Sequence, residues 1–167
     1  MTQSFTNRVA LVTGGASGIG RASALAFARR GAKVVVSDFN EDGGQETVQM
    51  IHDDDGEACF VRADVTHQAE VSALINAVQS TYGRLDFALN NAGIGGPRTN
   101  TADYPDDLWH RVIDVNLNGV WYCMKHEIPL MLSQGYGVIV NLASIAGLVG
   151  SPRLSAYAAS KHAVVGL

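Results

Sequence analysis

The chain has 167 residues, of which 47% are hydrophobic and 17% are charged, and its formal net charge is -4. This length suits one domain, and the apolar content excludes a disordered chain because it is enough to bury a core. The acidic balance is opposite to the basic face that marks nucleic-acid-binding proteins, so we expect no nucleic-acid partner.

The sequence predicts neither a secretory signal nor a membrane span. Residues 1–8 lack a basic segment followed by a long apolar stretch, which is the pattern of a signal peptide. Residues 128–152 carry no formal charge, but Pro129, Gly135 and Asn141 interrupt them before an apolar run of about 18 residues is reached. We therefore expect a cytoplasmic protein without membrane contact.

The cysteines and histidines predict no metal site. Cys59 and Cys123 lie far apart in apolar stretches, which favours buried free thiols over a disulfide or a zinc site. The five histidines lack ligand spacing and are expected at the solvated surface, and His126-Glu127 has no second histidine at the spacing of a zinc protease helix.

Strands and helices alternate along the whole sequence. Short apolar or β-branched runs predict strands at residues 9–13, 33–38, 58–62, 85–90 and 137–142. Helical patterns follow at residues 18–30, 41–52, 66–83, 105–132 and from 155 onward. Short connections between alternating elements imply βαβ units. The fold class is therefore α/β, a doubly wound parallel sheet (Rossmann fold), with residues 1–167 as a single dinucleotide-binding domain.

Individual residues predict where helices end and what they contact. Thr66 is the expected N-cap of the third helix, and Gly31 and Gly83 are expected to close the first and third helices. Apolar residues surround almost the whole circumference of helix 105–132, so we expect it to be buried on more than one side. A partner subunit is one way to bury it.

A glycine cluster follows the first predicted strand. Residues 13–20 read Thr-Gly-Gly-Ala-Ser-Gly-Ile-Gly, and the spacing Gly14-x-x-x-Gly18-x-Gly20 differs from G-x-G-x-x-G. At this position a dinucleotide pyrophosphate binds against the N-terminus of a helix, and glycine lets the backbone approach it. The alternative is a plain turn from strand to helix. The absence of a lysine at the P-loop position excludes a P-loop.

Asp38 ends the second predicted strand, 18 residues after Gly20. An acid about 20 residues beyond the glycines is placed to bind the hydroxyls of the adenosine ribose. Its carboxylate would repel a 2′-phosphate, and Phe39 and Asn40 follow it rather than a basic residue. NAD is therefore favoured over NADP, although an aspartate that only forms a turn is the alternative reading.

Tyr157 and Lys161 are four residues apart on a predicted helix and so share one face. A tyrosine is a poor base at neutral pH, but a lysine ammonium beside it favours the phenolate. Such a pair suits the proton transfer that accompanies hydride transfer between an alcohol and a carbonyl. Taken alone, however, most Tyr-x-x-x-Lys pairs are surface neighbours.

Two further polar residues are candidates for the same chemistry. Ser144 follows the fifth strand, where ligands of open α/β sheets bind. The alternative interpretation is that Ser144 only forms a turn. Asn116 lies in the middle of a predicted helix, which asparagine disfavours. The alternative interpretation is that Asn116 is simply an exposed polar residue.

Together these motifs resemble the classical short-chain dehydrogenase/reductase family, over nearly the whole chain from Thr13 to Lys161. Residues 13–20 match its T-G-x-x-x-G-x-G motif, and residues 90–93 match its N-N-A-G segment. Asp64-Val65 is similar to its adenine-contacting pair. The resemblance implies these cofactor-binding residues: Gly14, Ser17, Gly18, Ile19, Gly20, Asp38, Asp64, Val65, Asn91, Ala92, Gly93, Tyr157 and Lys161.

The resemblance also implies a catalytic tetrad of Asn116, Ser144, Tyr157 and Lys161. Tyr157 would exchange the proton with the substrate oxygen, and Ser144 would hold that oxygen. Lys161 would bind the nicotinamide ribose, and Asn116 would hold a water that links Lys161 to solvent. Family members also place Ile94 and Gly95 beside the cofactor, and we expect Ala143, Ile145 and Ala146 to line the pocket.

The family pattern implies an NAD-dependent oxidoreductase acting on a small alcohol or carbonyl substrate, assembled as a dimer or tetramer. The pattern stops after the fifth strand and the start of the next helix, so we expect the C-terminal part of the family fold to be absent and the fifth strand to form a bare edge. This departure keeps a second hypothesis open, a dinucleotide-binding module or fragment without turnover.

Overall fold

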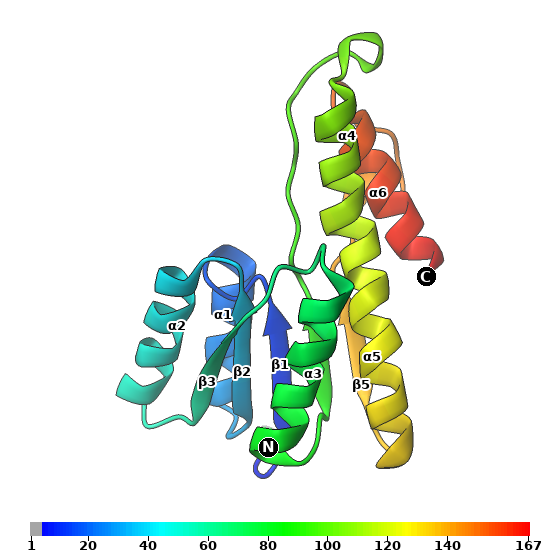
Figure 1. Cartoon of the computed structure of the whole chain (residues 1–167). Coiled ribbons are helices and arrows are strands. Elements are labelled where there is room, and N and C mark those ends of the chain that lie inside the picture. Colours follow the sequence, from blue (N-terminus) through cyan, green and yellow to red (C-terminus); the bar gives the residue numbers. More distant parts are fainter. Residues whose placement is uncertain (1–4) are drawn as a thin grey trace.

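The computed structural model describes residues 5–167 as a five-stranded parallel sheet in the order β3-β2-β1-β4-β5 (Figure 1). The strands are β1 (Val9–Thr13), β2 (Lys33–Asp38), β3 (Ala58–Arg62), β4 (Phe87–Asn90) and β5 (Val138–Asn141). Each begins and ends within three residues of the predicted strand. The predicted doubly wound fold is therefore confirmed, and every strand points its carboxyl end to the same edge of the sheet.

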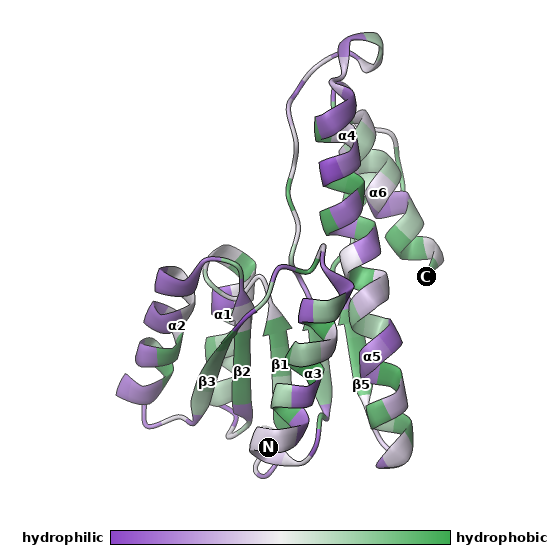
Figure 2. Ribbon diagram, in the orientation of Figure 1, coloured by the Kyte–Doolittle hydropathy of each residue, from purple (hydrophilic) through white to green (hydrophobic). Residues whose placement is uncertain are grey.

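Helices cover both faces of the sheet, as expected (Figure 1). They are α1 (Gly18–Ala28), α2 (Glu41–Asp53), α3 (Gln68–Tyr82), α4 (Asp106–Ile113), α5 (Gly119–Ser133) and α6 (Ser155–Gly166). Apolar residues of α1 and α2 pack on one face with Val34 and Val36, whereas α3 and α5 pack on the other face with Leu11 and Val35. Figure 2 shows the strands as the most hydrophobic elements and α2 as largely hydrophilic on its outer side.

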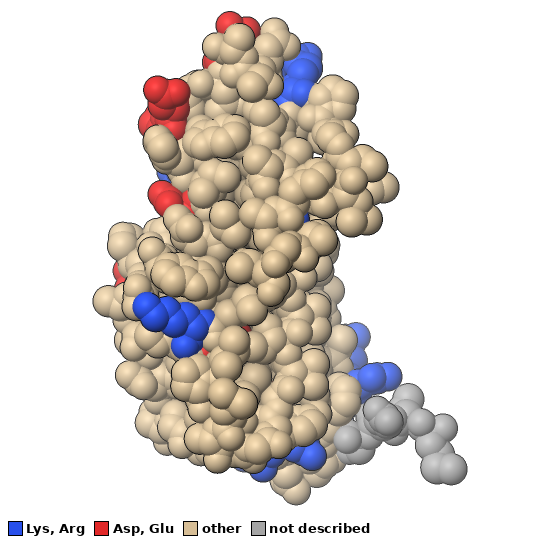
Figure 3. Space-filling model, turned by 90° about the vertical axis from the view of Figure 1, so that its right-hand side faces the viewer, with Lys and Arg blue, Asp and Glu red and all other residues tan. Residues whose placement is uncertain are grey.

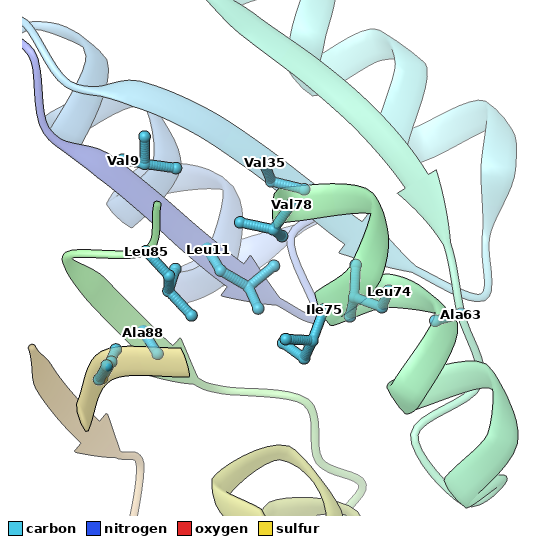
Figure 4. Packing of buried hydrophobic residues seen from close by; sticks show 10 residues of the cluster. Val9, Leu11, Val35, Ala63, Leu74, Ile75, Val78, Leu85 and Ala88 are labelled. Carbon is cyan, nitrogen blue, oxygen red and sulfur yellow. The ribbon is translucent and has the colours of Figure 1, made fainter. Parts of the chain in front are cut away.

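The core between α3 and the sheet explains why the strands are hydrophobic along their whole length. Figure 4 shows Leu74, Ile75 and Val78 of α3 directed at Leu11 and Val35. All five side chains are at most 5% exposed. Because successive residues of a strand point to opposite faces, a sheet covered on both sides buries every position.

The predicted helix 105–132 is one continuous helix with an interruption. A π-helical segment, Asp114–Asn118, joins α4 to α5. The expected burial on several sides is wrong for the chain by itself, because Trp121 is 45% exposed and Leu132 is 74% exposed. A π-helical segment adds one residue to a helical turn. The side of the helix that faces the protein interior is therefore not the same in α4 as in α5.

The start of α3 differs from its prediction. His67, not Thr66, takes the N-cap position, because Thr66 donates from both its backbone nitrogen and its hydroxyl to Asp64 Oδ1, at 2.9 and 2.8 Å. At the other end Gly83 closes the helix in the left-handed conformation (φ 72°), as predicted. The first helix ends at Ala28, two residues before its predicted end, and Gly31 follows with φ 87°.

The outer edge strand β5 is open on one face, as expected. Val138 and Val140 are 44% and 51% exposed, whereas Ile139 packs against the core on the α3 side. Figure 3, which looks at the side of the molecule formed by β5, α5 and α6, shows few charged side chains there.

The described residues include no helix long and apolar enough to cross a membrane. Residues 5–167 also include no group of three or more potential ligands arranged for a metal ion. Cys123 is buried and Cys59 is partly buried, both as free thiols. The N-terminal segment from which we expect no secretory signal begins with residues 1–4, which lie outside the described residues.

Candidate active site

A cleft of about 840 Å³ lies along the carboxyl ends of the strands. Its walls come from the segments that follow all five strands, together with α4 and the start of α6. Ligands of open α/β sheets bind at this edge. The cleft is therefore the candidate site, and most of the residues singled out from the sequence lie in its walls.

The glycine segment after β1 forms the floor of one end of the cleft. Gly14 has φ 65° and lies so close to Asn91 that a Cβ would be 2.8 Å from Asn91 Nδ2. Gly18 has φ 52° and no atom within 4 Å of a Cβ position. Ser17, the N-cap of α1, makes no side-chain capping bond, so its side chain does not occupy the N–H groups of the helix N-terminus at the cleft.

Gly20 differs from the other motif glycines because it does not line the cleft. A Cβ at this position would overlap the carbonyl oxygen of Gly14. Its role is therefore to let α1 pack closely against the loop. Ile19, by contrast, lines the cleft and is 62% exposed.

The segment after β4 is tied to the glycine loop. Asn91 donates from Nδ2 to the carbonyl oxygens of Thr13 and Gly14, at 3.0 and 3.1 Å. In return, Thr13 Oγ1 accepts from the backbone nitrogens of Asn91 and Ala92. These bonds fix the positions of Asn91, Ala92 and Gly93 in the cleft wall.

Asp38 lines the cleft at the end of β2. Its two carboxylate oxygens accept from the backbone nitrogens of Ala16 and Asn40, each at 3.0 Å. The aspartate therefore shapes the glycine loop as well as facing the cleft. Each carboxylate oxygen has two lone pairs, so capacity to accept from a ligand hydroxyl remains.

Asp64 and Val65 form the wall after β3. Burial by itself raises the pKa of Asp64, but the two hydrogen bonds from Thr66, together with the nearby His67 and Arg111, outweigh it and hold the pKa below its usual value. The carboxylate is therefore ionised at neutral pH.

Tyr157 and Lys161 of α6 line the same cleft. Lys161 is 4% exposed, and its Nζ donates to the carbonyl oxygen of Leu142 at 2.6 Å. The Nζ lies 5.8 Å from the centre of the Tyr157 ring. Burial lowers the pKa of Lys161 because it disfavours the charged form.

Ser144 lines the cleft beside Ala143. Its Oγ accepts from the backbone nitrogen of Ala146 at 3.2 Å, which starts the short turn Ile145–Gly147. This turn carries Ile145 into solvent, where it is 76% exposed, and buries Ala146, so neither lines the cleft. The expectation for Ile145 and Ala146 is therefore wrong.

Asn116 is completely buried behind the cleft wall, in the π-helical segment. Its Oδ1 accepts from the backbone nitrogen of Ile94 at 2.8 Å, and its Nδ2 donates to Ile94 O at 2.9 Å and Ser160 Oγ at 3.1 Å. The alternative reading as an exposed polar residue is excluded. Asn116 holds the cleft-lining loop after β4 against α6.

Several cleft residues were not singled out by the sequence. Phe39, which is 66% exposed, lines the cleft, and so do Arg98, Arg111, Val115 and Leu154. Phe39 directly follows Asp38, so its position alone could have identified it. The other four lie in loops or helices whose approach to the cleft depends on tertiary packing.

The sheet order and the loop at its carboxyl edge define a doubly wound, Rossmann-like α/β protein. Within that class, the chain belongs to the classical short-chain dehydrogenase/reductase family, because the family model described as short chain dehydrogenase matches residues 8–167.

Individual relatives agree with this assignment. The chain is 46% identical to a cyclohexanol dehydrogenase of Acinetobacter sp. (strain SE19), over all of this chain and 66% of the relative. It is 45% identical to a 3beta-hydroxysteroid dehydrogenase of Mediterraneibacter gnavus, over 98% of this chain and 59% of the relative. The chain thus spans less than two thirds of the length of these relatives.

Solved structures share the fold closely. The crystal structure of levodione reductase superposes with a TM-score of 0.95 at 38% identity, over 97% of this chain and 64% of that one. The crystal structure of an NAD+-bound xylitol dehydrogenase also gives a TM-score of 0.95, at 35% identity, over 97% and 62% of the two chains.

Proposed function

We propose that this chain provides the cofactor site and the catalytic residues of an oxidoreductase that transfers a hydride between a nicotinamide cofactor and a small alcohol or carbonyl substrate. The observation that carries the proposal is that Ser144, Tyr157 and Lys161 line the same cleft as the glycine loop. Relatives named as dehydrogenases and reductases support the reaction class.

The cleft fits a dinucleotide. The open space at Gly18 and the uncapped N-terminus of α1 suit a pyrophosphate, which accepts hydrogen bonds from backbone N–H groups. When bound, the nicotinamide ring supplies the hydride acceptor or donor. Asn91, Ala92, Gly93 and Lys161 are the groups proposed to border it, and Asp64 and Val65 to border the adenine.

NAD is the proposed cofactor rather than NADP. The Asp38 carboxylate faces the cleft at the end of β2, where the ribose hydroxyls of adenosine are held in this fold. Its charge would repel a 2′-phosphate. Two similar structures are described as complexes with NAD and one as a complex with NADP, so the family itself accepts both.

Four residues are proposed to divide the proton chemistry. In alcohol oxidation, the Tyr157 phenolate takes the hydroxyl proton while the C–H bond gives up its hydride. The Ser144 hydroxyl donates a hydrogen bond to the substrate oxygen. The Lys161 ammonium, held by Leu142, favours the phenolate and binds ribose. Asn116 is proposed to hold the water that connects Lys161 to solvent.

We also propose that the protein assembles as a dimer or tetramer and acts in the cytoplasm. The support for assembly is the exposed apolar surface on the long helix, where Trp121, Ile128 and Leu132 are 45%, 39% and 74% exposed. A buried interface of such side chains stabilises association.

The decisive experiment is Tyr157→Phe. NADH binding is measured by fluorescence, and NAD reduction is measured with cyclohexanol and a 3β-hydroxysteroid, the substrate types in the names of two relatives. The variant should keep NADH affinity and lose turnover. Tyr136→Phe is the matched control, because Tyr136 packs against Phe87 and Arg8, outside the cleft lining, and should change neither.

Two other outcomes would overturn the proposal. Turnover that survives in Tyr157→Phe would remove Tyr157 from the chemistry. NADH binding without turnover on any alcohol, in the unsubstituted protein, would favour the dinucleotide-binding module instead.

A further inference from the structure

A buried carboxylate lies beneath the cleft, on a residue that the proposed chemistry does not use. Glu127 of α5 is 0% exposed, and its Oε2 accepts from Asn90 Nδ2 at 3.1 Å. Among the described residues, its other oxygen, Oε1, has no hydrogen-bond partner. A buried carboxylate with only one hydrogen bond destabilises the fold. Buried groups of this kind are common at functional sites and rare elsewhere.

The partner of Glu127 connects two strand ends. Asn90 is the last residue of β4, and its Nδ2 donates to Asn141 Oδ1 at 3.0 Å as well as to Glu127. Asn141 is the last residue of β5 and is paired with Asn90 in the sheet. A backbone hydrogen bond connects the same two strand ends, because Leu142 N donates to Asn90 O at 3.0 Å.

Both strand ends lead directly into the cleft walls. Asn91 follows Asn90 and is bonded to Thr13 and Gly14 of the glycine loop. Leu142 follows Asn141, holds the ammonium of Lys161, and is two residues from Ser144. Asn90 is therefore connected, through its hydrogen bonds and the adjoining residues, to both the cofactor side and the catalytic side of the cleft.

As an extension that rests on the proposed function, we propose that Glu127 is a positioning residue whose carboxylate fixes the Asn90 side chain and thereby the cleft-lining segments 91–93 and 142–144. Glu127 itself does not line the cleft. It acts through Asn90, and no contact with the cofactor or substrate is required.

The surroundings of Glu127 make its ionisation matter near neutral pH. Burial raises the pKa of Glu127 to about 7, although the hydrogen bond from Asn90 opposes the rise. An ionised carboxylate accepts a stronger hydrogen bond than a neutral one, so Asn90 is held more firmly as the pH increases through this range. Cofactor affinity should rise with it.

The groups packed around Glu127 include few that titrate in this range. Asn90 on β4 and Asn141 on β5 are amides, and α3 packs against α5 with the uncharged Val71 and Leu74. Cys123 also lies on α5. Its burial, and the nearby Glu127, raise the pKa of its thiol well above the ordinary value, so the thiol stays neutral. His126 is the neighbour of Glu127 in sequence, so it is replaced separately in the tests below.

The first test needs no cofactor. The side-chain amide resonances of Asn90 and Asn91 are followed by NMR from pH 5.5 to 8.5 in the full chain. They should shift with a midpoint near 7 in the unsubstituted protein and in His126→Gln, and stay flat in Glu127→Gln, which keeps the shape of the side chain and cannot ionise. No midpoint in the unsubstituted protein, or the same midpoint in Glu127→Gln, would overturn the proposal.

The second test measures the affinity for NADH over the same pH range. One hydrogen bond of ordinary strength corresponds to a change of about threefold to tenfold in a binding constant. Affinity should rise by about that factor from pH 6 to 8 in the unsubstituted protein and in His126→Gln, but not in Glu127→Gln. An equal rise in Glu127→Gln would overturn the positioning role. NMR shifts as expected, without NADH binding at any pH, would instead overturn the proposed function.

Discussion

The ammonium group of Lys161 is held by the carbonyl oxygen of Leu142 at 2.6 Å, so a residue of α6 is fixed by the segment that follows β5. This bond sets the position of the charge beside the Tyr157 ring. Lys161→Met removes both the charge and the bond, and kcat should fall at least about 100-fold because general acid–base catalysis is lost. Steady-state kinetics with NAD and an alcohol measures it.

Lys125→Met provides the matched control for this experiment. Lys125 is exposed on α5, and its Nζ lies 5.2 Å from the centre of the Trp121 ring rather than in the cleft. Its kcat should equal that of the unsubstituted protein. A Lys161→Met enzyme with unchanged kcat, by contrast, would show that the proposed role is wrong.

Asp38 provides a test of cofactor choice. Asp38→Asn removes the charge that repels a 2′-phosphate and keeps one carbonyl oxygen that accepts from Ala16 or Asn40. The ratio of NADP to NAD affinity should increase by about tenfold or more, the equivalent of about 1.4 kcal/mol. Fluorescence titration with NADH and NADPH gives the ratio.

Asp42→Asn removes an exposed charge four residues further along the chain, in the first turn of α2, outside the cleft lining. It should leave the ratio unchanged. If both variants changed the ratio equally, the effect would come from net charge rather than from the position of Asp38.

The sequence predicted those features of the fold and site that depend on local patterns. Strand residues 9–13 and 33–38 are apolar enough to be buried on both faces, so periodicity located them. Gly14, Asp38 and Tyr157 line the cleft because Gly14 follows β1, Asp38 ends β2, and Tyr157 lies in the first turn of α6.

Other features depend on contacts between distant segments and could not be predicted in this way. The π-helical segment that buries Asn116 is stabilised by Ile94 and Ser160, which are far away in sequence. Glu127 reads as one charged residue on a long helix, and its complete burial depends on how α5 packs on β4. Periodicity reports which face is apolar but not which polar residue lies beneath a neighbouring strand.

The close packing around Gly20 predicts that a substitution there has a large effect on stability. In Gly20→Ala, the new Cβ would overlap the carbonyl oxygen of Gly14, so the backbone of α1 or of the loop must move. Overpacking of this kind typically costs about 1–3 kcal/mol, and backbone contacts put the expected loss at the upper end. Urea unfolding monitored by circular dichroism measures it.

Gly166→Ala is the matched control for that variant. Gly166 ends α6 and has no atom within 4 Å of a Cβ position, so the free energy of unfolding should change by less than about 1 kcal/mol. Equal losses in the two variants would mean that the close approach of Gly20 to Gly14 is unimportant.

The buried carboxylate of Glu127 predicts how stability depends on pH. Its pKa in the folded protein is about 7 instead of the ordinary 4.5, so the folded state holds the proton more tightly than the unfolded state. Between these two values the free energy of unfolding therefore decreases as the pH rises. Each unit of pKa difference between the folded and unfolded states corresponds to about 1.4 kcal/mol. The free energy of unfolding should therefore be lower by about 3 kcal/mol at pH 8.

Glu127→Gln should lack this loss, because its amide does not ionise. Urea unfolding at pH 5, 6, 7 and 8 should show the stability of the unsubstituted protein falling relative to that of Glu127→Gln, while the exposed Glu41→Gln follows the unsubstituted protein. Parallel curves for all three proteins would mean that Glu127 is ionised at no cost. A relative loss would show that this residue lowers stability at the same pH at which it is proposed to position the cleft, which is the usual trade-off at functional sites.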